Sequence, residues 1–156
     1  TRYISVTGVQ TCALPICLGE VIDARPDLVI FQTGTNDAIR AVPLATFEAL
    51  TRKDIAALHA AAIDIVLMEP QYSRAVTDAA DHMAYIELVR ALGAAYGLPV
   101  IRRFELMQRW LAEGRMTAAE MVTEDDLHMA DKGYAALAEA AAETILNGVQ
   151  IGRAHV

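Results

Sequence analysis

Two polar clusters in this sequence contain side chains suited to catalysis on a ligand. The first, Gly34-Thr35-Asn36-Asp37, directly follows an apolar run at residues 28–31. After a buried strand, Gly34 lets the backbone turn sharply. The amide of Asn36 can then donate a hydrogen bond to a ligand oxygen, as an oxyanion hole requires. The alternative is a polar turn in which Asn36 and Asp37 cap neighbouring backbone groups.

The second cluster is the run of residues 124–128, Glu-Asp-Asp-Leu-His. Asp125 lies three residues before His128, and in a tight loop it can accept a hydrogen bond from one imidazole nitrogen. The other nitrogen is then free to act as a base. The alternative is an acidic stretch that leads into the last helix, since acidic residues are favoured near helix N-termini.

The elements that position these clusters follow the pattern of a βαβ protein, in which short apolar runs alternate with longer amphipathic segments. Right-handed crossovers would place helices on both faces of an open parallel sheet, and such sheets bind ligands at the carboxyl ends of their strands. Both clusters fall at that edge. The pattern predicts strands at 28–31, 63–68 and 100–101, helices at about 18–22, 46–62, 85–96, 104–111 and 132–147, and polar loops at 33–37 and 114–126.

Together the two clusters resemble conserved blocks of a known family. Residues 25–37, Arg-Pro-Asp-Leu-Val-Ile-Phe-Gln-Thr-Gly-Thr-Asn-Asp, are similar to the third block of the SGNH, or GDSL-type, hydrolases. Residues 125–134, Asp-Asp-Leu-His-Met-Ala-Asp-Lys-Gly-Tyr, are similar to the final block, including its Asp-x-x-His pair. The order and separation of the two blocks also match.

This resemblance implies a serine esterase on a three-layer α/β/α flavodoxin-like fold, acting on small, carbohydrate-linked or lysophospholipid acyl esters without a metal or organic cofactor. His128 would be the general base that activates a serine in a Gly-Asp-Ser motif. Asp125 would orient the imidazole, and Asn36 would donate to the oxyanion. Gln71 and Tyr72, which follow the second predicted strand at the same edge, are predicted to contact substrate.

The chain departs from the family at the nucleophile. It contains no Gly-Asp-Ser, and its only serines are Ser5 and Ser73. Ser73 lies in a loop after a later strand and lacks the family's context, so we reject it as the nucleophile. We therefore expect this polypeptide to be inactive or nearly so.

Both ends of the sequence suggest why the nucleophile is missing. Residues 151–156 reverse-translate into a sequencing-library adapter, and the second half of residues 6–16 reverse-translates into its reverse complement. We therefore expect residues 1–16 and 151–156 to be adapter-derived, and residues 17–150 to be a partial hydrolase domain. The N-terminal strand or strands and the nucleophile block would be missing.

The composition narrows the classes of molecule that this protein is expected to bind. The formal net charge is −7, and removing the adapter-derived ends deletes basic residues but no acids. An acidic surface argues against nucleic acid or an anionic membrane as partner. The hydrophobic content of 54% is ample for a core, yet no apolar run approaches the roughly 20 residues of a membrane span. Cys17 is the one cysteine outside the adapter-derived ends, and a single cysteine does not indicate a zinc site. The sequence leaves the oligomeric state and the cellular compartment open.

Two other interpretations stand beside the esterase. The chain could be a non-catalytic doubly wound domain that binds a small molecule or a protein at the strand edge, with Asn36 and Asp125 as polar anchors. In addition, a domain without its first strand would have an unpaired sheet edge. Such a chain should aggregate or stay partly unfolded.

Overall fold

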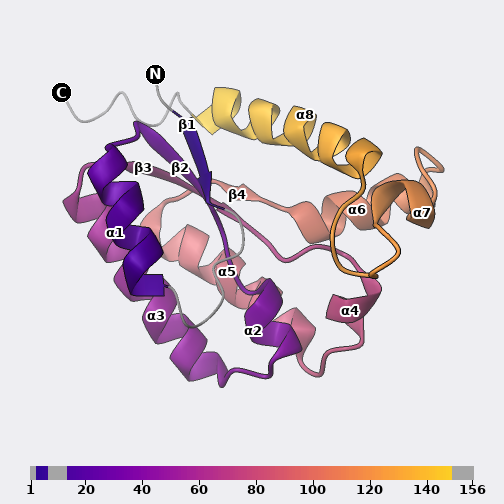
Figure 1. The fold of residues 1–156 in the computed structure, drawn as a ribbon, viewed down its shortest axis with the longest axis horizontal. Helices are drawn as coiled ribbons and strands as arrows, with labels where there is room; N and C mark the ends of the chain where they lie inside the picture. The colour runs from indigo at the N-terminus through magenta and orange to yellow at the C-terminus, as the bar shows by residue number, and fades with distance from the viewer. Residues whose placement is uncertain (1–2, 7–13, 149–156) are drawn as a thin grey trace.

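A computed structural model describes residues 3–6 and 14–148, and its centre is a parallel four-stranded sheet in the order β1-β2-β3-β4 (Figure 1). The strands are β1 (Tyr3–Val6), β2 (Leu28–Gln32), β3 (Asp64–Met68) and β4 (Val100–Ile101). The three strands predicted from the apolar runs are thus confirmed as β2, β3 and β4. Leu28 of β2 pairs with Asp64, and Met68 at the end of β3 pairs with Ile101.

Alternate residues of the strands enter two separate cores, one on each face of the sheet. Val29 and Phe31 of β2 pack into the first core, while Leu28 and Ile30 of the same strand pack into the second. This alternation is the expected consequence of the two-residue period of a strand. Because both faces are covered, the fold is the predicted three-layer α/β/α sandwich.

Helices from different parts of the chain cover the two faces (Figure 1). The first core contains residues of the helices α1, α3 and α5, and the second contains residues of α6, α7 and α8. Each long helix is amphipathic and buries its apolar side against the sheet. Their bounds are α1 Leu14–Ala24, α3 Leu44–Ala60, α5 His82–Tyr96, α6 Arg103–Ala112, α7 Ala118–Met121 and α8 Asp131–Gly148.

Three short helices were not predicted, and two of them overlap the stretches 33–37 and 114–126, where loops were expected. They are α2 (Thr35–Ile39), α4 (Arg74–Thr77) and α7. Thr117 and Glu120 form a reciprocal capping box at the start of α7, a local signal that is readable from the sequence. Helices of four or five residues have too few turns to show an apolar period, so pattern reading misses them.

β1 was not among the predicted strands, because it lies in the stretch expected to be adapter-derived. It pairs in parallel with β2 from Tyr3 opposite Leu28 to Val6 opposite Phe31. The edge of β2 that was expected to be unpaired is therefore covered. An open strand edge presents a row of unpaired N–H and C=O groups that a short β-prone segment can bond.

Candidate active site

The first predicted cluster lies at the turn from β2 into α2. Gly34 precedes the helix with φ 91°, in the left-handed region that favours glycine. A Cβ atom at this position would lie 3.2 Å from the Phe47 ring and 3.3 Å from Pro70 Cγ. Gly34 therefore lets α2 begin directly at the strand end, which places Asn36 at the carboxyl edge of the sheet.

Asn36 is half-buried, and its backbone carbonyl accepts from the Arg40 N–H at 3.0 Å. Within residues 3–6 and 14–148, the structure shows no hydrogen bond to its side-chain amide. The capping role considered as an alternative is thus not seen for that amide in the part of the chain described. Its N–H groups can be offered to a ligand oxygen.

The second predicted cluster forms a tight loop around the Asp125 carboxylate. Oδ2 lies 2.5 Å from His128 Nδ1. Oδ1 accepts from the Leu127 and His128 backbone N–H groups, both at 2.9 Å, and from the Thr123 hydroxyl at 2.6 Å. The hydrogen bond from His128, followed by those from Thr123 and the two backbone groups, holds the pKa of Asp125 below its usual range.

This loop presents His128 at the surface. Its side chain is 68% exposed, while its carbonyl accepts from the Thr123 N–H at 2.8 Å. An isolated antiparallel bridge between Val122 and Met129 closes the base of the loop. With Nδ1 directed to Asp125, the other imidazole nitrogen, Nε2, is available for proton transfer.

One side chain joins the two clusters. Gln71, which follows β3, accepts a hydrogen bond from the Thr35 hydroxyl at 2.8 Å and donates to the Leu127 carbonyl at 3.0 Å. Thr35 precedes Asn36 and Leu127 precedes His128, so both candidate side chains lie next to residues bound by the same amide. Figure 1 shows the loop before α8 descending beside α4, where the Ala75 N–H donates to the Asp126 carbonyl at 3.1 Å.

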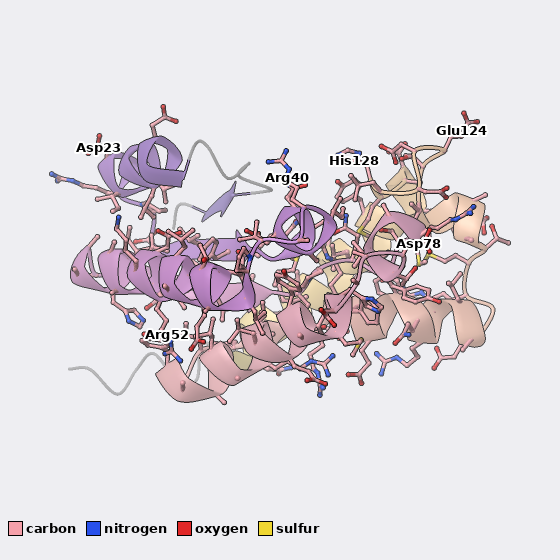
Figure 2. The ribbon with its side chains drawn as sticks, turned by 90° about the horizontal axis from the view of Figure 1, so that it is seen from below. Asp23, Arg40, Arg52, Asp78, Glu124 and His128 are labelled. Carbon is pink, nitrogen blue, oxygen red and sulfur yellow. The ribbon has the colours of Figure 1, made fainter. Side chains whose placement is uncertain are left out.

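His128 and Arg40, the residue at the C-terminal end of α2, project on the same side of the molecule in Figure 2. Gln71 itself is only 5% exposed. The substrate contact predicted for it stays a prediction, and the structure adds a connecting role.

Sequence analysis missed Arg103, which completes this polar network. Its guanidinium is buried and donates to the Glu69 carbonyl at 2.9 Å and to Gln71 Oε1 at 2.6 Å. Burial lowers the pKa of Arg103 to about 9. One signal was available, since Arg103 follows the apolar pair Val100-Ile101 at the edge where the other site residues were expected.

The remaining loop residues after β3 are mostly inside the protein. Tyr72 is half-buried and packs edge-on against Phe104, with ring centroids 5.2 Å apart. The substrate contact predicted for Tyr72 stays a prediction. Ser73 is 4% exposed and precedes α4. Its burial agrees with our rejection of this serine as a nucleophile.

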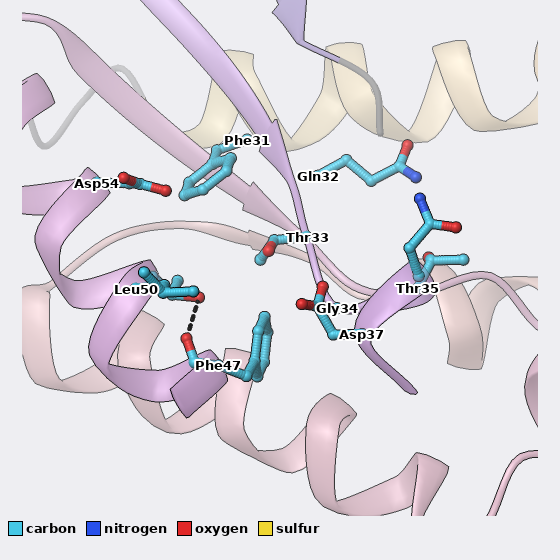
Figure 3. A pocket seen from close by; sticks show the side chains of 11 residues that line it. Phe31, Gln32, Thr33, Gly34, Thr35, Asp37, Phe47, Leu50 and Asp54 are labelled. Atoms are coloured by element: carbon cyan, nitrogen blue, oxygen red, sulfur yellow. Dashed lines mark hydrogen bonds between the residues drawn. The ribbon is translucent and has the colours of Figure 1, made fainter. Parts of the chain in front are cut away.

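A small pocket opens between α2 and α3, beside the Asn36 turn (Figure 3). Its volume is ≈ 20 Å³, which holds about one water molecule. In Figure 3 the Phe31 ring lies beside Asp54, and the Phe47 ring lies near Gly34 and Asp37. Burial raises the pKa of Asp54 to about 6 and also raises that of Asp37.

The described residues contain neither a cluster of metal-binding side chains nor a membrane-spanning helix. No group of three or more His, Cys, Asp or Glu side chains within 3–6 and 14–148 is arranged to hold a metal ion. In the same ranges, no helix combines the length and apolar character that crossing a membrane requires.

Comparison with known proteins gives a consistent result. A family model described as the non-GDSL lipase-like family matches residues 13–151. A lipase/acylhydrolase from Enterococcus faecalis has a similar structure, with a TM-score of 0.70 and 25% sequence identity over 85% of this chain and 67% of that one. No curated protein showed significant sequence similarity.

Two further solved structures share the fold at lower identity. An acetylxylan esterase from Geobacillus stearothermophilus has a TM-score of 0.71 and 20% identity, over 86% of this chain and 66% of that one. A member of the lipolytic protein G-D-S-L family from Veillonella parvula has a TM-score of 0.67 and 14% identity, over 86% of this chain and 75% of that one. The chain thus spans about two thirds to three quarters of the length of these proteins.

Proposed function

Because this chain belongs to the non-GDSL lipase-like family, we propose that it is part of a serine esterase of the SGNH/GDSL type. The observation that carries the proposal is the pair of hydrogen bonds by which Gln71 accepts from Thr35 and donates to Leu127, because they connect the Asn36 turn to the Asp125–His128 loop. A base with its orienting carboxylate and an oxyanion donor are the parts that ester hydrolysis by a serine needs beside the nucleophile.

In the proposed reaction, His128 Nε2 takes the proton from a serine hydroxyl as its oxygen attacks the ester carbonyl carbon. Asp125 keeps Nδ1 protonated and stabilises the imidazolium that forms. Asn36 donates to the carbonyl oxygen as it becomes an oxyanion. His128 then protonates the leaving alcohol, and a water molecule, activated in the same way, releases the acid and regenerates the serine.

The substrate is proposed to be a small-molecule acyl ester: a small ester, a carbohydrate-linked ester or a lysophospholipid. The similarity to a lipase/acylhydrolase at 25% identity supports acyl-ester hydrolysis. None of the roles proposed for His128, Asp125 and Asn36 requires a metal or an organic cofactor.

We also propose that this chain by itself is inactive or nearly so, because neither Ser5 nor Ser73 lies in a Gly-Asp-Ser motif. Residues 17–150 would be the partial hydrolase domain, and residues 1–16 and 151–156 would derive from an adapter. Sequencing the source DNA upstream of the Cys17 codon tests this. A strand-coding stretch ending in Gly-Asp-Ser would support the truncation. An intact upstream region without that serine would favour the non-catalytic binding domain.

The activity is tested on a protein completed with its own upstream sequence. We expect it to hydrolyse a short-chain aryl ester, and we expect His128→Ala to lower kcat by about four orders of magnitude or more, as loss of a triad base does. His59→Ala is the matched control, because His59 is an exposed histidine on α3 that packs near Tyr96. Undiminished turnover in His128→Ala would refute the assignment of the base.

A further inference from the structure

Arg103 is a buried cation, and among the described residues its hydrogen bonds all go to uncharged oxygens. Only 3% of the residue is exposed. Its Nε donates to the Glu69 carbonyl at 2.9 Å, and its Nη2 donates to Gln71 Oε1 at 2.6 Å and to the Thr35 hydroxyl at 3.4 Å. Burying a charge is costly, and an apolar side chain of the same volume would avoid that cost. The guanidinium therefore calls for an explanation other than filling space.

The explanation lies in the direction that Arg103 gives to the Gln71 amide. A guanidinium has only donors, whereas a Gln amide has an oxygen that accepts and a nitrogen that donates. Facing Arg103, the amide must present its oxygen, because its NH₂ group would meet the guanidinium N–H groups. The NH₂ group is then directed to the Leu127 carbonyl, where its hydrogen bond measures 3.0 Å.

We propose that Arg103 is a positioning residue: it fixes the orientation of the Gln71 amide and thereby holds the Asn36 turn and the Asp125–His128 loop in register. Three strand ends supply the parts, since Thr35 follows β2, Gln71 follows β3 and Arg103 follows β4. The Arg103–Gln71 clamp, meaning these two side chains with Thr35, connects the two clusters across the sheet edge. Its importance for catalysis rests on the proposed function, but its geometry can be tested without hydrolysis.

Gln71→Glu is the most informative variant, because it keeps the hydrogen bonds to Arg103 and Thr35 and removes the one to Leu127. A carboxylate still accepts hydrogen bonds from Arg103 and from the Thr35 hydroxyl. It also places a negative charge in direct contact with the Arg103 guanidinium, whose hydrogen-bond partners are otherwise uncharged. It has no donor for the Leu127 carbonyl, and its second oxygen faces that carbonyl. We expect cooperative unfolding to be retained. We also expect amide hydrogen exchange at Leu127 and His128 to accelerate by about tenfold or more, as the loss of a hydrogen bond implies.

Arg103→Met removes the donors that select the amide orientation. In ¹H–¹⁵N NMR spectra of this chain, we expect it to shift the backbone signals of both Asn36 and His128 and to accelerate exchange at both segments. Arg90→Met is the matched control. Arg90 donates to the buried Glu69 carboxylate at 2.5 Å, so its loss should lower stability without a direct effect on Gln71.

The outcomes separate a positioning role from a purely structural one. The proposal is supported if Gln71→Glu loosens the His128 loop while the Asn36 signals stay, and if Arg103→Met affects both segments more than Arg90→Met does. It is overturned if Gln71→Glu leaves His128 unchanged, or if Arg90→Met produces the same pattern as Arg103→Met. Because these readouts need no turnover, failure of the clamp and failure of the esterase assignment remain distinguishable.

Discussion

The Asp125 carboxylate uses its two oxygens for different purposes. Oδ2 binds the His128 imidazole, whereas Oδ1 receives the backbone N–H groups of Leu127 and His128. The same side chain therefore shapes the loop and orients the His128 imidazole, the proposed base. Two residues three positions apart can make this arrangement through local contacts, which is why the spacing alone predicted it.

Asp54 offers a prediction about pH and stability. Burial on α3 raises its pKa from 3.8 to about 6. The folded protein therefore binds this proton more tightly than the unfolded chain does, and the free energy of unfolding should fall as the pH rises from about 4 to 6. At about 1.4 kcal/mol per pKa unit, the loss is at most about 3 kcal/mol. Asp54→Asn should remove this dependence and stabilise the protein above pH 7.

Urea unfolding at several pH values measures this effect. The parent protein and Asp54→Asn should differ little at pH 4 and increasingly between pH 4 and 6, with the variant more stable. Equal midpoints for the two proteins at pH 8 would show that the Asp54 carboxylate is not destabilised by its surroundings.

The polar network around Gln71 was beyond sequence analysis for a physical reason. Gln71 contacts Arg103 across 32 positions and Thr35 across 36 positions of sequence. No local pattern encodes such pairs, because the strand order of the sheet brings them together. Asn36 and the Asp125–His128 pair were predictable because each lies in a short motif beside an element end.

The apolar periods in the sequence predicted the long helices and the buried strands, but they did not predict how the helices contact one another. Gly133 illustrates this on α8. A Cβ atom there would lie 2.5 Å from the Met121 carbonyl oxygen of α7. The close approach of α7 and α8 fixes the base of the His128 loop, since the Ala130 N–H also donates to Met121.

Gly133→Ala should therefore destabilise the protein. The new methyl group meets backbone, which cannot move as a side chain can, and overpacking typically costs about 1–3 kcal/mol. Gly19→Ala is the matched control, because Gly19 lies in α1 and a Cβ atom there meets nothing within 4 Å. That variant should gain up to about 1 kcal/mol from helix propensity.

The urea concentrations at the unfolding midpoints of Gly133→Ala, Gly19→Ala and the parent protein test these expectations. A Gly133→Ala protein as stable as Gly19→Ala would mean that α7 and α8 are not in close contact at this point.

At the scale of the whole molecule, parallel topology explains how distant segments form one site. All strands point the same way, so the residues that follow β2, β3 and β4 meet at one edge. The sequence predicted this edge from strand order and crossover rules. It did not predict β1, because residues 3–6 were assigned to the adapter and only the pairing with β2 makes them a strand.

We propose that Asn36 and His128 act on the same ester carbonyl. The most direct test is to measure kcat and KM for a short-chain aryl ester with the completed protein and with its Asn36→Ala variant. Loss of one oxyanion donor typically lowers kcat by about 10²–10³, and we expect that fall with little change in KM. An Asn36→Ala enzyme with the kcat of the parent would show that Asn36 does not donate to the oxyanion.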